Sequence, residues 1–377
     1  MDKLYSKGSR ERANWTVALL SVICLCIFTY LFTQWQQNGN FLPVWDTSAA
    51  GDEQTGGVFY TLYDQDTGEA IEYMSRNVYP GDELLTGDNR HYKVRRVEGQ
   101  QVFCQLMERR DLKAVLAQLH SAAETVSTGG AFHSIAIYCT HSDESYVPTS
   151  GTESKNGGGD ILDVATTMAE ELEAQGIEVI HSENIHDPHD VNAYQRSRKT
   201  AAQLLQEAPA AIIDVHRDGV PDPEYYATEI NGEAATQIRL VVGRQNQNSE
   251  ANIAFAEKMK AYYDEVKPGL IKSIFMAKGN YNQDLAPNSV LLEVGTHTNT
   301  LEQAEVGARE FAEVLPQFLG LKTAVEEQPQ APSAETEQPV SAEKGANGMG
   351  KAILWIVIVA VLGGLAFVWI SRGTFRQ

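Results

Sequence analysis

Between residues 134 and 319 the chain alternates short apolar runs with longer stretches in which apolar residues recur every three or four positions. Runs rich in Ile, Val and Leu predict buried strands, and the longer period predicts amphipathic helices. The expected strands are 134–140, 177–180, 211–215, 238–242 and 289–294, and the expected helices are 161–175, 193–207, 249–263 and 301–319. This alternation predicts an α/β domain over residues 133–320, with a parallel or mixed sheet and helices on both faces.

Residues at the ends of the expected helices indicate where these helices begin and stop. Asp160 and Ser249 are expected N-caps, and Thr300 with Gln303 forms a capping-box pattern. Gly176 is the expected C′ glycine of the first helix.

Residues 58–110 follow a different pattern, in which apolar and polar positions alternate in short runs separated by Gly-Asp and Thr-Gly turns. A period of two predicts strands, so we expect a small β module there. A connector of mixed helical and Ser/Gly-rich character, residues 111–132, joins it to the α/β domain.

Two apolar runs of membrane-spanning length lie near the ends of the chain, at 15–34 and 351–371. Basic residues precede the first run and acidic residues follow it, so the positive-inside rule predicts an uncleaved signal anchor and an extracytoplasmic middle region. Residues 1–14 and 372–377 would then be cytoplasmic tails, and the expected location is the cell membrane. Residues 35–57 are an expected linker, and 321–350, rich in Pro, Glu, Gln and Ser, an expected disordered tether.

Charge and cysteine content exclude several classes of function. The chain has 377 residues and a formal net charge of −20, which argues against binding to nucleic acid. Outside the apolar runs only Cys104 and Cys139 remain, too few for a disulfide framework. A bond between these two cysteines has no support in the sequence.

Polar clusters with metal-binding side chains follow two of the expected strands. His141 and Glu144 form an H-x-x-E pattern after the first strand, and His216 lies between Asp214 and Asp218 at the end of another. Zinc binds imidazole nitrogen and carboxylate oxygen at about 2.0–2.2 Å, and a catalytic site uses three protein ligands. Loops converge beyond the strand ends of an open α/β sheet, so these residues are candidate ligands of one zinc ion, with Asp214 and Asp218 orienting His216.

A third strand ends at Glu293, and a buried acid there needs a partner or a function. A zinc hydrolase requires a carboxylate beside the metal to accept and return a proton. We assign Glu293 this role and Glu144 the role of ligand, while the reverse assignment stays open.

Other side chains compete for these roles. His181, His186 and His189 form a cluster that is expected to be mainly solvated loop, and His297 is a secondary candidate for the site. Cys139 lies two residues before His141, but no helix begins directly after it to lower its pKa, so it is a weak candidate nucleophile.

Taken together, five motifs resemble the stage II sporulation protein P family over about residues 133–319. They are H-x-x-E-S at 141–145, D-x-H-R-D at 214–218, V-G-R-x-N at 242–246, Y-N-Q-D-L-x-P at 281–287 and L-E-V-G at 292–295. The resemblance implies a zinc-dependent N-acetylmuramoyl-L-alanine amidase fold that cleaves the stem peptide from the glycan of peptidoglycan, with a further activity on peptide crosslinks. It also implies septal wall thinning and engulfment during sporulation, beside a lytic transglycosylase of the stage II sporulation protein D type and a membrane scaffold protein.

Carried over residue by residue, the resemblance implies His141, Glu144 and His216 as zinc ligands and Glu293 as catalytic acid/base. Arg217, Arg244, Asn246 and Asn282 are implied as substrate-binding residues. In the better-known zinc amidases the ligand glutamate lies further on, ahead of the first helix, which leaves Glu153 and Asp160 as alternatives to Glu144. Two other functions fit the same motifs: a zinc carboxypeptidase-like peptidase, and a catalytically silent wall-binding scaffold.

Overall fold

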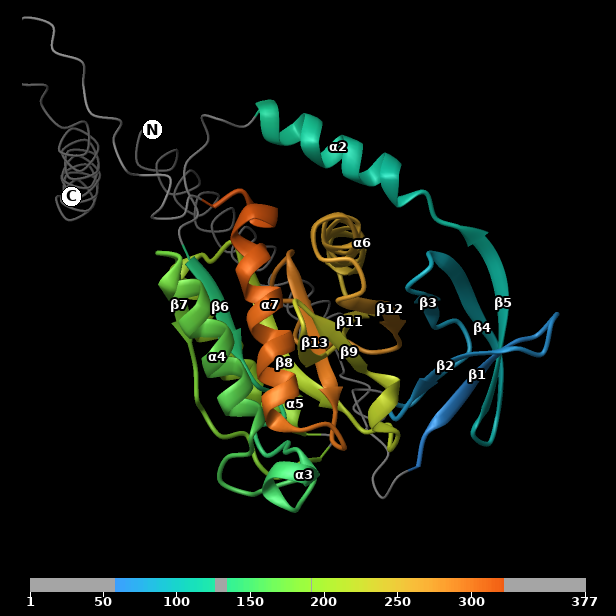
Figure 1. Cartoon of the computed structure of the whole chain (residues 1–377), viewed down its shortest axis with the longest axis horizontal. Coiled ribbons are helices and arrows are strands. Elements are labelled where there is room, and N and C mark those ends of the chain that lie inside the picture. Colours follow the sequence, from blue (N-terminus) through green and yellow to red (C-terminus); the bar gives the residue numbers. More distant parts are fainter. Residues whose placement is uncertain (1–57, 126–133, 191, 322–377) are drawn as a thin grey trace, which may run out of the picture. The chain divides into compact units, whose positions relative to one another are not determined.

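The computed structural model describes residues 58–125, 134–190 and 192–321 (Figure 1). The expected linker, tether, membrane spans and cytoplasmic tails lie outside these ranges, apart from residue 321. Within the described ranges no helix combines the length and the apolar character that crossing a bilayer requires.

The main sheet of the described residues has eleven strands in the order β2-β1-β5-β4-β3-β12-β11-β13-β8-β6-β7. The strands are β1 Tyr60–Asp64, β2 Ala70–Met74, β3 Glu83–Leu85, β4 Arg90–Glu98, β5 Gln101–Arg109, β6 Ser134–Tyr138, β7 Glu178–His181, β8 Ala211–Asp218, β11 Ile238–Gly243, β12 Ile271–Ala277 and β13 Ser289–Thr296. Strands β9 Ala227–Ile230 and β10 Glu233–Thr236 form a separate antiparallel pair. The helices are α2 Leu112–Thr125, α3 Val147–Ser150, α4 Ile161–Ala174, α5 Ala193–Leu204, α6 Ser249–Val266 and α7 Leu301–Leu319, with 3₁₀ turns η1 Leu205–Glu207 and η2 Pro223–Tyr225.

The sheet is mixed, as expected. Strands β7, β6, β8 and β13 run parallel to their neighbours in that group, whereas β11 pairs antiparallel with β13 and parallel with β12. The fold class is therefore α/β with a large mixed sheet.

Helices pack on both faces of the sheet because successive strand residues point to opposite sides. Ile135, Ile137 and Ile213 belong to the core that α4, α6 and α7 cover. Ala136 and Ile212, one position away, pack instead with residues of α5.

The N-terminal strands are not confirmed as a separate β module. They do form strands, but β3 pairs antiparallel with β12 and so joins them to the main sheet. A shared apolar cluster supports this connection: Leu62, Met74 and Tyr92 pack together with Val241 and Phe275 of β11 and β12. The segment 70–76 consequently lies against the α/β part of the fold. Strand β12 and the β9–β10 hairpin were not predicted.

One of the four predicted helix-end signals is wrong, and Asp160 occupies the predicted N-cap position of α4 without capping the helix through its side chain. The Asp160 side chain makes no cap hydrogen bond; its carboxylate accepts from the Tyr146 backbone N–H at 3.0 Å and the Ser150 hydroxyl at 2.5 Å. Ser249 is the first residue of α6, and the N-cap position belongs to Asn248. The Thr300–Gln303 capping box is confirmed, as is Gly176, which has a φ of 81° after α4.

Candidate metal centre

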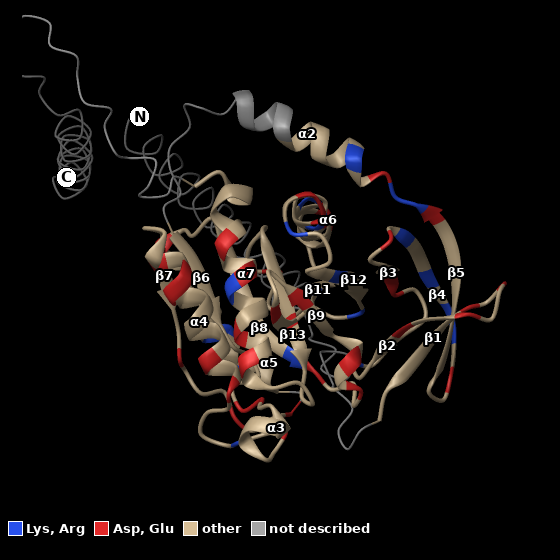
Figure 2. Ribbon diagram, viewed as in Figure 1, with Lys and Arg blue, Asp and Glu red and all other residues tan. Residues whose placement is uncertain are grey.

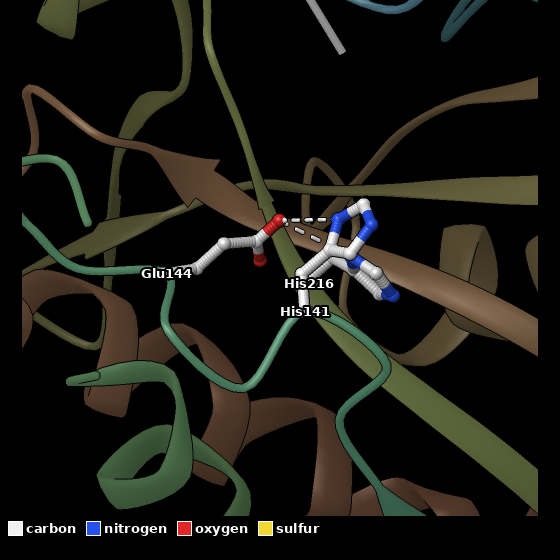
Figure 3. Close-up of side chains that lie close together, drawn as sticks. All are labelled: His141, Glu144 and His216. Carbon is white, nitrogen blue, oxygen red and sulfur yellow. Dashed lines mark hydrogen bonds and ion pairs between the residues drawn. The ribbon is translucent and has the colours of Figure 1, made fainter. Parts of the chain in front are cut away.

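Three buried side chains meet at the carboxyl ends of β6 and β8: His141 and Glu144 in the loop after β6, and His216 near the end of β8 (Figure 3). Their potential ligand atoms all lie within 4.8 Å of one another. Glu144 Oε1 is between the two imidazoles, 3.2 Å from His141 Nδ1 and 3.3 Å from His216 Nδ1. The structure thus brings together the three residues that the strand-end motifs singled out.

Parallel pairing of β6 with β8 places the loop after β6 beside His216, since Tyr138 is in register with Asp214. The loop is held by the turn before α4. Ser142 carbonyl accepts from Gly159 N–H at 2.7 Å, and Glu144 carbonyl accepts from Ile161 N–H at 3.0 Å. Backbone hydrogen bonds therefore set the position of Glu144.

Charge is balanced within this group. The pKa of His141 is lowered to about 3, mainly by burial and also by the neighbouring imidazoles of His189 and His216. Burial alone would raise the pKa of Glu144, but His216 and Arg217 hold it well below its usual value. For His216, the carboxylates of Asp214 and Glu144 outweigh the effect of burial and raise the pKa well above the usual value.

The imidazole of His141, the carboxylate of Glu144 and the imidazole of His216, which lies beside two carboxylates, form a donor set suited to a divalent cation. A cation that displaces the His216 proton would meet two nitrogen ligands and one oxygen ligand, the combination that zinc accepts. The residues present therefore fit a zinc ion.

Asp214 stands where an orienting carboxylate should be. Its Oδ1 lies 3.0 Å from His216 Nε2, and its carboxylate accepts from the Thr140 N–H at 2.8 Å and the Thr140 hydroxyl at 2.7 Å. This contact directs Nδ1 of His216 towards Glu144. Asp218, the other expected orienting residue, instead pairs with Arg239.

Glu293 is on β13, in register with His216 of β8, and therefore lies next to the three candidate ligands. It is 3% exposed, and burial raises its pKa to about 7 even though Arg76 lowers it. Its Oε1 accepts from Arg76 Nη2 at 2.6 Å, and its Oε2 has no hydrogen-bond partner among the described residues. A carboxyl group with this pKa can accept or donate a proton near neutral pH.

The alternatives that the sequence left open lie elsewhere. Asp160 is engaged with Tyr146 and Ser150 as described above, and neither Asp160 nor Glu153 belongs to the group of potential ligand atoms. His297 lies beyond β13, where its backbone N–H donates to the Asp218 carbonyl at 2.9 Å.

The histidine cluster divides into different environments. His186 is buried, with Nδ1 2.8 Å from the Cys139 carbonyl and Nε2 2.9 Å from the Thr200 hydroxyl. The His189 ring packs on His141, with centroids 3.9 Å apart, and its Nδ1 is 3.3 Å from Asp143. The expectation of mainly solvated loop residues is therefore wrong for His186. His181 is partly buried at the end of β7.

Cys139 has no feature of a nucleophile. It is fully buried, and burial raises the pKa of its thiol well above the usual value. Cys104 and Cys139 are both free cysteines.

Comparison with known proteins identifies the family. The sequence model of one protein family, "Stage II sporulation protein P (SpoIIP)", matches residues 88–316 of this chain. The chain belongs to the stage II sporulation protein P family. A curated relative, stage II sporulation protein P of Bacillus subtilis (strain 168), is 29% identical over 203 residues, which are 49% of this chain and 50% of that protein. The chain thus aligns with about half the length of this relative.

Solved amidase structures resemble this stage II sporulation protein P family member more distantly. The CwlD amidase of Clostridioides difficile, solved in complex with the GerS lipoprotein, has 14% identity and a TM-score of 0.35 and covers 50% of this chain and 98% of its own. The catalytic domain of CwlV, an N-acetylmuramoyl-L-alanine amidase of Bacillus (Paenibacillus) polymyxa var. colistinus, has 16% identity and a TM-score of 0.30. The match covers 50% of this chain and 99% of the CwlV domain.

The residues expected to bind substrate in this family member make structural contacts. Arg217 donates its backbone N–H to Glu144 Oε2 at 3.0 Å and its Nη2 to the Glu153 carbonyl at 2.9 Å. Arg244 pairs with Asp82 at 2.9 Å. These contacts do not test a role in substrate binding, which stays a prediction for Arg217 and Arg244.

The two asparagines are similarly engaged. Asn246 bonds within its own turn, to the Gly243 carbonyl at 3.0 Å and the Asn248 N–H at 2.9 Å. Asn282 donates to the Tyr194 carbonyl and the Ser197 hydroxyl, both at 3.0 Å. Their predicted contact with substrate is likewise untested.

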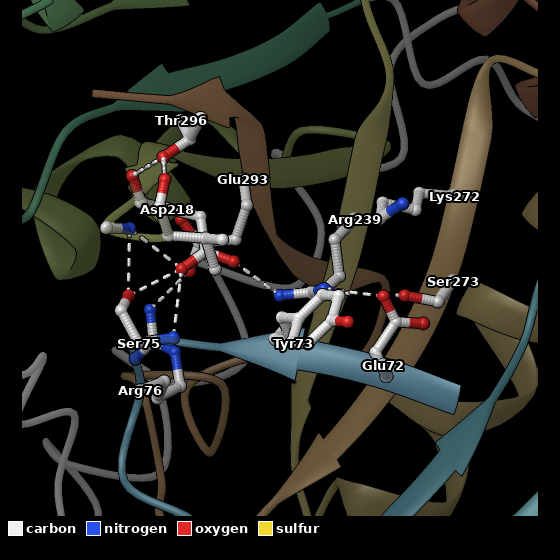
Figure 4. A network of polar contacts seen from close by, with 12 residues as sticks. Glu72, Tyr73, Ser75, Arg76, Asp218, Arg239, Lys272, Ser273, Glu293 and Thr296 are labelled. Atoms are coloured by element: carbon white, nitrogen blue, oxygen red, sulfur yellow. Dashed lines mark hydrogen bonds and ion pairs between the residues drawn. The ribbon is translucent and has the colours of Figure 1, made fainter. Parts of the chain in front are cut away.

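Sequence reasoning missed Arg76, which reaches Glu293 from the segment after β2 (Figure 4). A buried polar network anchors that segment to the sheet. Arg239 of β11 pairs with Glu72 at 2.9 Å and with Asp218 at 2.5 Å, and the Ser75 hydroxyl donates to Asp218 at 2.5 Å. Arg76 lies upstream of the range 88–316 that the family model matches. The residues next to Arg76 in the sequence form no motif that could have revealed its contact with Glu293.

Proposed function

We propose that this chain is a zinc hydrolase of peptidoglycan that cleaves the amide bond between N-acetylmuramic acid and L-alanine. The observation that supports it best is the buried group of His141, Glu144 and His216 beside a second carboxyl group, Glu293, with a pKa of about 7. Three protein ligands leave one position for water on a four-coordinate ion. Family membership supports the choice of peptidoglycan as substrate.

The two carboxylates have different environments, which supports the roles assigned to them. Glu144 contacts both imidazoles, and its pKa is held well below the usual value, so it is an anionic ligand. Glu293 contacts Arg76 instead, and its second oxygen is available for a proton. In the reverse assignment Glu144 would accept the proton of the water molecule, which its low pKa disfavours.

Zinc, when bound, polarises the amide carbonyl and lowers the pKa of a water molecule towards about 7. Glu293 accepts the proton of the attacking water. As the carbon–nitrogen bond breaks, Glu293 returns this proton to the departing amino group of L-alanine. Asp214 keeps His216 in its ligating orientation throughout.

The same proposal includes the setting of the reaction. Anchors at 15–34 and 351–371 would hold the enzyme in the cell membrane with residues 35–350 outside, next to the wall. There it would thin septal peptidoglycan during engulfment, beside a transglycosylase of the stage II sporulation protein D type and a membrane scaffold protein. Co-purification of the full chain with these partners from sporulating cells tests this setting.

The decisive experiment uses the full chain in detergent and purified peptidoglycan. Mass analysis of the released fragments should show free stem peptides with an L-alanine amino terminus, and a chelator should abolish their release. His216→Ala should lose both zinc and activity, whereas Glu293→Gln should keep zinc and lose activity. Arg96→Ala, which changes an exposed arginine of β4, is the matched control.

Other fragment patterns would identify the competing functions. Release of terminal amino acids from peptides that lack glycan would indicate a zinc carboxypeptidase-like peptidase, and cleaved crosslinks would add an endopeptidase activity. An unmodified wall together with bound zinc would indicate a silent scaffold. Hydrolysis retained in His216→Ala would contradict the proposed ligand set.

A further inference from the structure

The Arg76 guanidinium has more hydrogen-bonding capacity than its neighbours use. Arg76 is 5% exposed, and its Nη2 donates to Glu293 Oε1 at 2.6 Å. Its Nε and Nη1 are buried and have no hydrogen-bond partner among the described residues. Leaving buried donors unsatisfied costs the full desolvation of those groups, so such donors in a folded protein call for a ligand, an ion or a water molecule.

A second unsatisfied donor lies beside Arg76. Tyr194 is 5% exposed, and its hydroxyl has no hydrogen bond of acceptable geometry among the described residues. The hydroxyl and the Arg76 guanidinium are nevertheless close enough for Arg76 to lower the pKa of Tyr194, which burial raises. The Arg76 guanidinium also lies over the Tyr281 ring, with Cζ 5.2 Å from the ring centroid.

This pair is directly adjacent to the candidate metal centre. The Tyr194 ring stacks on His216 with a centroid distance of 6.2 Å and an interplanar angle of 14°. It also meets the His141 ring edge to face, at 5.5 Å. The guanidinium is in contact with Glu293, so Arg76 and Tyr194 together adjoin both the proposed proton acceptor and the proposed ligands.

We propose that Arg76 and Tyr194 bind the carbonyl oxygen of the scissile amide in the state in which this oxygen carries negative charge. This inference rests on the proposed function, because it assigns a role in that reaction. The oxygen of water forms a bond to the carbonyl carbon, its proton moves to Glu293, and the π electrons of the carbonyl move onto the carbonyl oxygen. Arg76 and Tyr194 donate to this oxygen until its electron pair restores the double bond and the carbon–nitrogen bond breaks.

The packing around Arg76 favours this role over simple neutralisation of Glu293. A single N–H is enough to pair with the carboxylate, and a phenylalanine would make the same ring contacts as Tyr194. In addition, the network of Glu72, Ser75, Asp218 and Arg239 holds the segment that carries Arg76 in place (Figure 4). Donors fixed before the reaction begins are the ones that stabilise a developing charge most effectively.

Steady-state kinetics of the full chain on a soluble muramoyl peptide test the proposal. Tyr194→Phe keeps the ring and removes only the hydroxyl, so kcat should fall about a hundredfold while KM stays within about twofold. Arg76→Lys keeps the charge but loses the fork of donors, and its kcat should also fall at least about tenfold. Zinc content and melting temperature should stay at the wild-type values in Tyr194→Phe.

A binding measurement separates charge stabilisation from a structural effect. A phosphinate analogue, in which tetrahedral phosphorus replaces the carbonyl carbon, should bind Tyr194→Phe more weakly by the same factor as kcat/KM falls. Arg96→Ala should match the wild type in every measurement.

Each negative result has its own meaning. Wild-type kcat in both Tyr194→Phe and Arg76→Lys would overturn the inference and show that the unsatisfied donors hold water only. An inactive wild-type chain that contains zinc would refute the proposed function instead. Because Tyr194→Phe leaves the packing intact, the test does not depend on the folding of the more disruptive variant Arg76→Ala.

Discussion

Replacing Gly159 by alanine should disable the metal centre without altering a ligand. Gly159 lies between the His141–Glu144 loop and α4, and its φ is not in the left-handed region, so the backbone itself would accept alanine. Space would not. A Cβ atom at this position would be 2.1 Å from the Glu144 carbonyl oxygen and 2.4 Å from that of Asp143, where real Cβ atoms stay beyond 3.0 Å.

The size of the effect follows from this overlap. The Glu144 backbone must retreat by about 0.9 Å, the difference between 2.1 Å and 3.0 Å. That movement weakens the hydrogen bonds from Ile161 to Glu144 and from Gly159 to Ser142, each worth about 1 kcal/mol. With the added strain we expect a loss of about 2–4 kcal/mol in the free energy of unfolding. Displacing a ligand or its support typically lowers metal affinity about 10–100-fold, and a shift of about 1 Å can lower the rate about a hundredfold.

Zinc affinity is measured by competition with a chromogenic chelator, stability by denaturant unfolding, and activity on peptidoglycan in parallel. Gly157→Ala is the matched control, because Gly157 has a left-handed φ of 88° but no atom within 4 Å of its added Cβ. The control should lose about 1 kcal/mol of stability and keep wild-type zinc affinity. If Gly159→Ala bound zinc as tightly as the wild type and kept its rate, the placement of Glu144 against this turn would be incorrect.

Three further predictions concern charged side chains. The kcat/KM of the wild type should fall as the pH drops below about 7, because Glu293 has a pKa of about 7 and must be ionised to accept a proton. A nearby cation would lower this pKa and move the fall in kcat/KM to lower pH. Glu293→Gln should lose this pH dependence together with most of its rate. Glu83 has a pKa lowered to about 2 by its hydrogen bond to His91 and by Lys93, so its contribution to stability is complete above pH 4.5 and is lost as pH falls towards 2. After allowance for its partial exposure, we expect Glu83→Gln to lower the free energy of unfolding above pH 4.5 by about 1 kcal/mol and to reduce the loss of stability between pH 4.5 and 2 by the same amount. Acid unfolding measures both, and a pH dependence of stability equal to that of the wild type would count against the pairing. Arg239→Met leaves the carboxylates that it neutralised buried, so urea unfolding should show a loss of about 3–5 kcal/mol, and a change below about 1 kcal/mol would contradict this view of the network.

Local signals in the sequence were sufficient for much of the α/β part. Five strands between residues 134 and 296 could be predicted because each is a short apolar run that ends at a polar cluster. The Thr300–Gln303 capping box and Gly176 were correct because both depend on neighbouring backbone groups only. His141, Glu144 and His216 could be grouped because parallel strands bring their carboxyl ends to the same edge of a sheet.

Signals failed where a distant partner decided the outcome. Asp160 occupies the predicted N-cap position of α4, but its carboxylate accepts from the Tyr146 N–H and the Ser150 hydroxyl instead of making a cap hydrogen bond. Strand β12 was missed because a lysine and a serine interrupt its apolar run, and its pairing with β3 depends on residues far away in the chain.

The sequence by itself determined which strands carry the metal-binding side chains, because periodicity and strand ends are local properties of the chain. Only the tertiary structure decided that the segment after β2 brings Arg76 to Glu293, over a separation of 217 residues. It likewise decided that Tyr194 of α5 stacks on His216 of β8. A side chain's partners across such distances depend on how strands from different parts of the chain pair within one sheet, and no pattern of neighbouring residues records that pairing.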